Sequence, residues 1–275
     1  MSVIEYYLHR AKFIKSTQGD LFLPNISSSL LFKITLDEKP EITLKQDNVW
    51  HIGNIEYFDE MTGSFAVGRT TKTTVERFDA KTGNFIDLID DSGPYTNVLF
   101  DCSIGLLGIA KKTKLAPDVE SIARKITKLF ESGDTVKEHG VEVRIDIIPD
   151  PDGFIKKLRS AYSIKRFKAS FSGPNPIDAD EVFQKPISVY CKEVNGQYGT
   201  VEVVGEQLNE ENIVAVAKST AATGNTASAK IQPSHDKEYT IIKLKGDAVR
   251  ITVDTEKPKS EALKEMQEAY YRVRK

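Results

Sequence analysis

Residues 154–176 read FIKKLRSAYSIKRFKASFSGPNP, a stretch that joins a predicted helix to a predicted strand and holds six basic side chains and no acidic one. The apolar residues of the helix, at helical spacing, are Phe154, Ile155, Leu158 and Tyr162. Residues 164–171 alternate instead, with Phe167 and Phe171 on the face opposite Arg166 and Lys168. Gly173-Pro174-Asn175-Pro176 predicts a turn. We therefore expect a strand with an apolar inner face and a basic outer face.

A second alternating segment precedes this stretch. Residues 141–148 place apolar side chains on one face and Glu142, Arg144 and Asp146 on the other, which predicts a half-buried strand. A turn at 149–153 links this strand to the helix. Residues 141–171 thus form a strand, helix, strand unit, and its short connection allows either a parallel crossover or an antiparallel return.

The N-terminal third is rich in β-branched and aromatic residues and predicts an antiparallel meander. Turns with acidic residues and glycine at 59–63 and 79–84 separate its strands, and Gly53 and Gly68 are candidate bulge positions. The predicted strands cover residues 3–14, 41–44, 50–58, 64–78 and 85–89, and residues 97–110 as two short strands or one bent strand. Residues 25–36 predict a short helix that turns into a strand.

The C-terminal part mixes helices and strands. Asp118 predicts the start of a helix over residues 119–130, which Gly133 ends. Residues 237–244 and 248–253 flank Lys245-Gly246-Asp247 and predict a hairpin. Further helices are predicted at 209–222 and 259–274, a loop at 223–229, and irregular, partly extended chain at 182–190 and 199–204.

These patterns predict an α+β fold with mostly antiparallel sheets, divided into a β-rich N-terminal part, residues 1–110, and a mixed α/β part, residues 111–275. The net charge of −2 conceals an uneven distribution, since 14 lysines and arginines stand against 9 aspartates and glutamates between Lys111 and Ser170. A polyanion-binding face on an otherwise acidic protein gives this pattern, and so do solvated surface lysines.

Several classes of protein lack support in the sequence. Cys102 and Cys191 are too few and too far apart for a disulfide scaffold or a structural zinc site, and we expect buried, reduced thiols. The N-terminus lacks a secretory pattern and the longest apolar run, residues 104–110, is far shorter than a membrane span. We therefore expect a cytoplasmic protein without membrane insertion.

No catalytic motif is legible in the chain. It holds no phosphate-binding loop, no dinucleotide fingerprint and no nucleophile elbow, and its four histidines are scattered, so we expect no cofactor, no metal and no catalytic residue. One enzymatic alternative stays open. A metal-dependent nuclease would use the acidic side chains Glu142, Asp146, Asp150 and Asp152, with Lys156 nearby. Arg144 lies between the first two and offers a simpler role as their neutralising partner.

The basic side chains of the middle segment are the better candidates for a function. Lysine and arginine supply sequence-independent affinity for phosphates, and few aromatic side chains are free to stack on bases, which favours duplex backbone binding over single-strand stacking. The candidate DNA-binding residues are Lys111, Lys112, Lys114, Arg124, Lys125, Lys128, Lys156, Lys157, Arg159, Lys165, Arg166 and Lys168.

The basic alternating strand that leads into Pro174-Asn175-Pro176, the β-rich first half and the C-terminal segment AYYRVRK resemble the layout of RexA-like and KwaB-like phage-exclusion and phage-defence proteins. The resemblance implies sequence-nonspecific DNA binding, often by a homodimer, in bacterial or prophage antiviral defence. It carries over no catalytic residue. A further alternative is a protein-protein interaction module whose basic face docks on an acidic surface of a second defence subunit.

Overall fold

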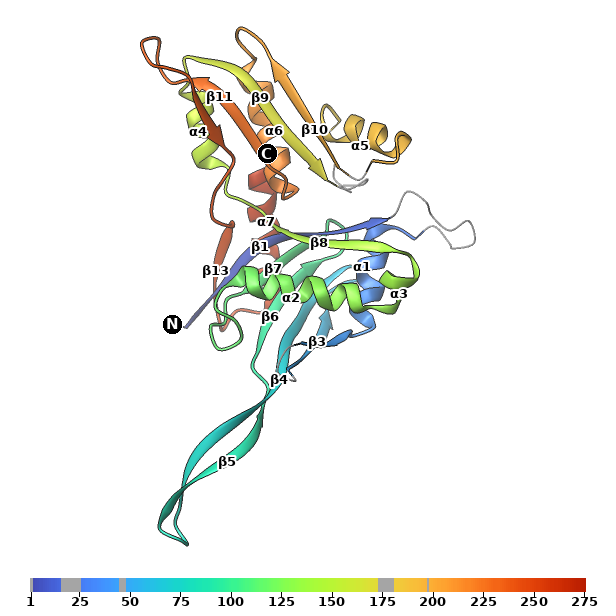
Figure 1. The fold of residues 1–275 in the computed structure, drawn as a ribbon, viewed down its shortest axis with the longest axis vertical. Helices are drawn as coiled ribbons and strands as arrows, with labels where there is room; N and C mark the ends of the chain where they lie inside the picture. The colour runs from blue at the N-terminus through green and yellow to red at the C-terminus, as the bar shows by residue number, and fades with distance from the viewer. Residues whose placement is uncertain (1, 16–25, 45–47, 173–180, 197) are drawn as a thin grey trace.

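The computed structural model describes residues 2–15, 26–44, 48–172, 181–196 and 198–275, and it confirms the predicted α+β class. Two sheets form its frame, and every pairing between the described strands is antiparallel. Figure 1 shows the smaller sheet above the larger one, with helices packed on both. The predicted turn at 173–176 lies outside the described residues.

The large sheet has nine strands, with β5 added to β4 and β8 added to β1 outside the main order β13-β1-β7-β6-β4-β3-β2. Its strands are β1 (Val3–Lys15), β2 (Glu41–Thr43), β3 (Val49–Tyr57), β4 (Thr62–Asp79), β5 (Asn84–Ser92), β6 (Tyr95–Asp101), β7 (Leu106–Ala110), β8 (Val141–Ile147) and β13 (Arg250–Asp254). From Thr71 outward β4 pairs with β5 alone, so the two strands form an arm that projects from the body (Figure 1).

The small sheet has four strands in the order β10-β9-β11-β12. They are β9 (Ser163–Ser172), β10 (Tyr198–Val204), β11 (Ala227–Gln232) and β12 (Thr240–Lys243). Alternation holds from Arg166 to Ser172 of β9, where Phe167 and Phe171 are buried and Lys168 is exposed. Ile164, which strict alternation placed with Arg166, is buried instead, because the register shifts between these two residues. The basic strand of the opening stretch is therefore a central strand of this second sheet.

The helices divide between the two cores. One core lies between the large sheet and α1 (Ser28–Asp37), α2 (Val119–Ser132) and α3 (Asp134–Glu138). The other lies on the opposite face of the large sheet and continues under the small sheet. Its helices are α4 (Asp152–Arg159), α6 (Glu210–Ala222) and α7 (Lys259–Arg274), and α5 (Gln184–Glu193) packs beside it against β9 and β10. The outer face of the small sheet carries none of the described helices.

Two predictions that depended on strand pairing were wrong. The strands on either side of α4 lie in different sheets, β8 in the large one and β9 in the small one, so neither a parallel crossover nor an antiparallel return exists. The expected hairpin of β12 and β13 is also absent from the described chain, because β12 pairs with β11 and β13 with β1. Gly246 passes so close to the Asp150 carbonyl that a Cβ atom would lie 2.6 Å from it, and the connection crosses between the sheets here.

Local predictions hold better, with four corrections. Residues 28–37 are helical throughout, α5 replaces the irregular chain expected at 182–190, and β11 begins inside the expected loop. The register shifts after Gly53, as a bulge requires, but Gly68 is tight against Tyr95 and Pro94 instead of forming a bulge. The predicted division at residue 110 stays a prediction, and β8 and β13 from beyond it belong to the large sheet.

A buried lysine joins the two sheets. The ammonium group of Lys12 on β1 donates hydrogen bonds to Asp146 on β8 at 3.0 Å, to Ser172 on β9 at 2.8 Å and to Asn225 at 3.1 Å. Its side chain is 11% exposed and that of Asp146 is 39% exposed. Burial lowers the pKa of Lys12, while the charge and the hydrogen bond of Asp146 act in the opposite direction. The cation thus needs its carboxylate partner to remain buried and charged.

Removing that partner should destabilise the whole fold. We expect Asp146→Ala to lower the free energy of unfolding by about 2 kcal/mol, because the Lys12 charge stays buried without compensation. The control is Glu142→Ala on the same strand, whose partner Arg144 is about one-third exposed, and it should cost less than about 1 kcal/mol. Urea denaturation of both variants measures the difference, and equal losses would contradict the role given to Lys12.

Candidate nucleic-acid interface

The predicted DNA-binding residues lie in three separate places. Lys111, Lys112 and Lys114 follow β7 and lead into α2, which carries Arg124, Lys125 and Lys128. Another group lies on α4 and the last on β9. The structure therefore divides the single basic surface expected from the sequence, and each part must be judged by its own surroundings.

Helix α2 presents its basic side to solvent because its other side is buried in the core. Asp118 caps the helix, with its carboxylate accepting a hydrogen bond from the Ser121 amide at 2.6 Å. The buried side chains are those that the periodicity predicts: Val119, Ile122, Ala123, Ile126, Leu129 and Phe130. Since this apolar stripe packs against the large sheet, Arg124, Lys125 and Lys128 must point outward or sideways.

Lys125 lies at the centre of a positive cluster. Its ammonium group is 5.9 Å from the centroid of the Trp50 ring, a cation–π contact with β3. Partial burial lowers the pKa of Lys125, and the neighbouring charges of Lys128, Arg124 and Arg69 lower it further. Like charges gathered around Lys125 in this way create a local positive potential suited to an anion.

Arg69 is the member of this cluster that the sequence did not reveal. It lies on β4 opposite Trp50 of β3, a residue buried in the core beneath α2, and the pairing therefore turns Arg69 toward the α2 side of the sheet. Its backbone amide donates to the Pro94 carbonyl at 3.1 Å, at the start of β6. A single arginine between Gly68 and Thr70 has no distinguishing sequence signal, because its face depends on the register of two strands.

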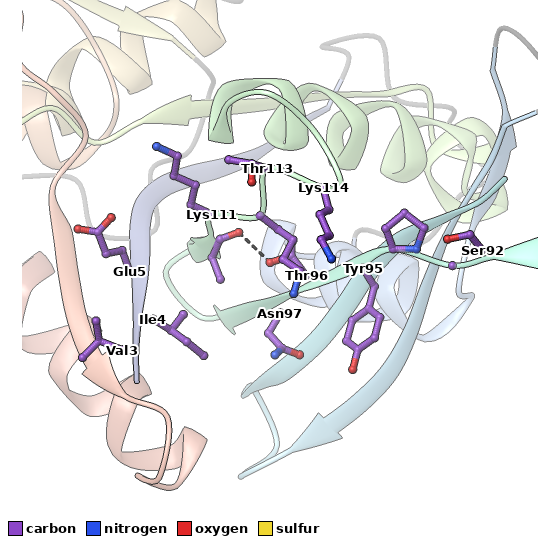
Figure 2. A pocket seen from close by; sticks show the side chains of 14 residues that line it. Val3, Ile4, Glu5, Ser92, Tyr95, Thr96, Asn97, Lys111, Thr113 and Lys114 are labelled. Atoms are coloured by element: carbon purple, nitrogen blue, oxygen red, sulfur yellow. Dashed lines mark hydrogen bonds between the residues drawn. The ribbon is translucent and has the colours of Figure 1, made fainter. Parts of the chain in front are cut away.

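A groove lies beside the lysine loop, and Glu5 is the acidic residue in its lining. It has a volume of about 830 Å³ and lies between the beginnings of β1 and β6 and the loop from Lys111 to Lys114. Figure 2 shows Lys114 extending from the loop toward Tyr95 and Thr96, whose hydroxyl donates to the Ala110 carbonyl at 2.8 Å. Pro94, which lines the groove, also accepts the backbone amide of Arg69, so β4 passes next to the groove at this residue.

We group the cations of the loop, of α2 and of β4 under one name, the basic band. Its members are Arg69, Lys111, Lys112, Lys114, Arg124, Lys125 and Lys128. Among the described residues only Arg124 of this band has an acidic partner within ion-pair distance, Asp118 at 3.9 Å. The other charges of the band are thus available to a ligand from solution.

The cations of α4 lie elsewhere. Phe154, Ile155 and Leu158 of this helix are buried in the core shared with α6 and the inner face of the small sheet. Tyr162, predicted for the same apolar face, lies beyond the helix and is 54% exposed. Lys156, Lys157 and Arg159 are exposed on a flank that neither the basic band nor the outer face of β9 shares.

The cations of β9 lie on its outer face and at its register shift. Arg166 and Lys168 lie on the outer face, where Arg166 pairs with Glu202 of β10 at 3.5 Å. Lys165 is half-buried and lies at the register shift between Ile164 and Arg166, where the alternation is interrupted. Among the predicted residues of this strand, Arg166 and Lys168 are therefore the ones on the open surface.

The acidic alternative does not assemble a metal site. Glu142 pairs with Arg144 at 2.5 Å, Asp146 with Lys12, and Asp150 accepts the backbone amide of Asp152 at 2.9 Å. No group of three or more histidine, cysteine, aspartate or glutamate side chains in the described chain could hold a metal ion. Both cysteines are buried, as predicted, and burial raises the pKa of each thiol.

No protein-family model matches the chain, and none of the curated proteins matches it significantly. The described helices include none that is long and apolar enough to cross a membrane. The expected cytoplasmic location and the resemblance to phage-defence proteins stay predictions.

The like-charge cluster can be tested by titration. Lys128→Gln should raise the pKa of Lys125, because it removes the repelling charge with the largest effect while the contact with Trp50 remains. NMR titration of lysines labelled by reductive ¹³C-methylation follows individual side chains. Lys137→Gln on α3 serves as the control, and an unchanged pKa of Lys125 in Lys128→Gln would contradict the cluster.

Proposed function

We propose that this protein is a sequence-nonspecific binder of duplex DNA that contacts the phosphate backbone through the basic band and acts in antiviral defence. The observation that carries the proposal is the convergence of Lys125, Lys128, Arg124 and Arg69 from two different elements. These charges disfavour each other in the free protein, and an anion bound between them would relieve that cost.

The chemistry of the band suits phosphates better than bases. Helix α2 has 14 residues, about 21 Å at 1.5 Å per residue. Each DNA strand carries a phosphate about every 3.4 Å, so a helix of this length can follow several of them. Contacts from lysine and arginine to phosphates position a protein on DNA without reading the sequence. The expected binding is therefore strong at low salt and uniform across sequences.

The defence role rests on a different kind of support. It comes from the resemblance of residues 154–176 and of the chain layout to RexA-like and KwaB-like proteins, together with the absence of a legible catalytic motif in the sequence. A homodimer and a second defence subunit are the partners that this resemblance suggests. Neither partner is needed for the DNA contact itself, which the band of one chain would supply.

The test compares two variants with the same change in charge. The first is Arg124→Gln, Lys125→Gln and Lys128→Gln on α2, and the second is Arg159→Gln, Lys156→Gln and Lys157→Gln on α4. Fluorescence anisotropy with a labelled duplex of mixed sequence, at several salt concentrations, gives the affinity and its salt dependence. We expect the α2 variant to bind at least about tenfold more weakly at low salt, with a slope of log K against log salt reduced by about 2 to 3.

The α4 variant should bind like the unchanged protein, because its cations lie away from the band. Equal loss in both variants would show that only the total charge matters, and unchanged affinity in the α2 variant would remove the band as the interface. Affinity that does not depend on salt would contradict phosphate binding altogether.

A further inference from the structure

The outer face of the small sheet is a second basic surface, independent of the band. The helices beneath this sheet, α4, α5 and α6, lie on its inner face, where Phe167, Phe171 and Ala229 are buried. In Figure 1 the open face of β9 and β11 is turned to the viewer, with α6 behind them. None of the described helices covers it, and at its Ser172 end the described residues Lys12 and Asn225 contact it.

Strand register places cations side by side across this face. One row runs through Glu202, Lys168, Ser228 and Lys243, and the next through Val204, Arg166, Lys230 and Ile241. Arg166 and Lys230 are thus directly opposite each other on neighbouring strands, about 5 Å apart at the backbone. Like charges in such a position destabilise a sheet, so folding alone gives no reason for the pairing.

The balance of charge on the face remains positive. Glu202 is the acidic side chain in these two rows, and it pairs with Arg166 at 3.5 Å. Lys168, Lys230 and Lys243 form no ion pair with a described carboxylate. A polyanion laid across the strands would therefore meet three uncompensated ammonium groups.

Aromatic side chains accompany the cations. Tyr239, which precedes β12, is 42% exposed and packs its ring 5.4 Å from the Lys230 ammonium group. Tyr198 at the start of β10 is 71% exposed, and Ile241 between the lysines is 54% exposed. An open antiparallel sheet with basic and aromatic side chains is the kind of surface on which unpaired bases stack while their phosphates contact lysine or arginine.

We propose that this open sheet face binds single-stranded nucleic acid. The phosphates lie along Lys168, Lys230, Lys243 and Arg166, and bases stack on Tyr239 and Tyr198. A duplex keeps its bases inside and cannot use the tyrosines, so the face prefers unpaired strands. This surface is distinct from the basic band and does not depend on the duplex binding proposed for it.

The experiment measures binding of labelled oligothymidylate and oligouridylate of about 12 nucleotides, a length within the range that one small binding domain covers. The sheet variant is Lys168→Gln, Lys230→Gln and Lys243→Gln, all at exposed or half-exposed positions. It should weaken single-strand binding at least about tenfold and lower the salt slope by about 2. Its duplex affinity should change by less than about twofold, while the α2 variant should show the opposite pattern.

Stacking has its own pair of variants. Tyr239→Ala should weaken single-strand binding about fivefold or more, whereas Tyr239→Phe keeps the ring and should bind normally. Photo-crosslinking of a 4-thiouridine oligonucleotide, followed by mass spectrometry, should identify Tyr239 or Tyr198. The thymidylate and uridylate arms decide between DNA and RNA as the source of the strand.

Several results would overturn the proposal. Unchanged single-strand affinity in the sheet variant would do so, as would equal effects of Tyr239→Ala and Tyr239→Phe. Displacement of the oligonucleotide by polyglutamate at equal charge concentration would show a general acidic partner instead. If the α2 variant alone lost both ligands, the open face would carry no binding, whatever the outcome for duplex DNA.

Discussion

The ammonium group of Lys12 fixes the position of the small sheet relative to the large one. It reaches from β1 to Asp146 in the same sheet and to Ser172 in the other, so a single buried charge connects three segments that are far apart in the chain. Burying a charge costs free energy unless its partners are fixed, and this cost makes the arrangement specific. The second connection, in which Arg10 donates to the Tyr270 hydroxyl at 2.8 Å, ties the C-terminal helix to the same strand.

The packing of the two sheets against each other decides which basic surfaces face the same side of the molecule. Helix α2 covers the front of the large sheet in Figure 1, and the open face of the small sheet is turned to the same side. The helices of the shared core lie behind both sheets. A nucleic acid that is partly duplex and partly single-stranded could therefore meet the basic band and the open face from one direction. The cations of α4 are close to β9 in sequence, but the small sheet separates them from its own open face.

The periodicity of the sequence predicted most of the helices and strands. It did not predict which strands pair with one another. The stripe from Val119 to Phe130 and the alternation around Phe167 predict α2 and β9 because local burial leaves a local pattern. The same reasoning could not place β8 and β9 in different sheets, since the pattern of a strand does not say what it pairs with. Arg69 was missed for this reason, and the charge count between Lys111 and Ser170 joined residues that the fold separates.

The arm formed by β4 and β5 is the part of the molecule that we expect to open locally. Beyond Thr71 its strands have only each other as hydrogen-bonding neighbours, and at its tip Phe78 and Phe85 pack together at 5.3 Å between ring centroids. A two-stranded ribbon without a third strand is marginally stable by itself. The arm can therefore separate and close again while both cores stay intact, and its amide hydrogens would exchange with solvent at a rate set by local opening and independent of global unfolding.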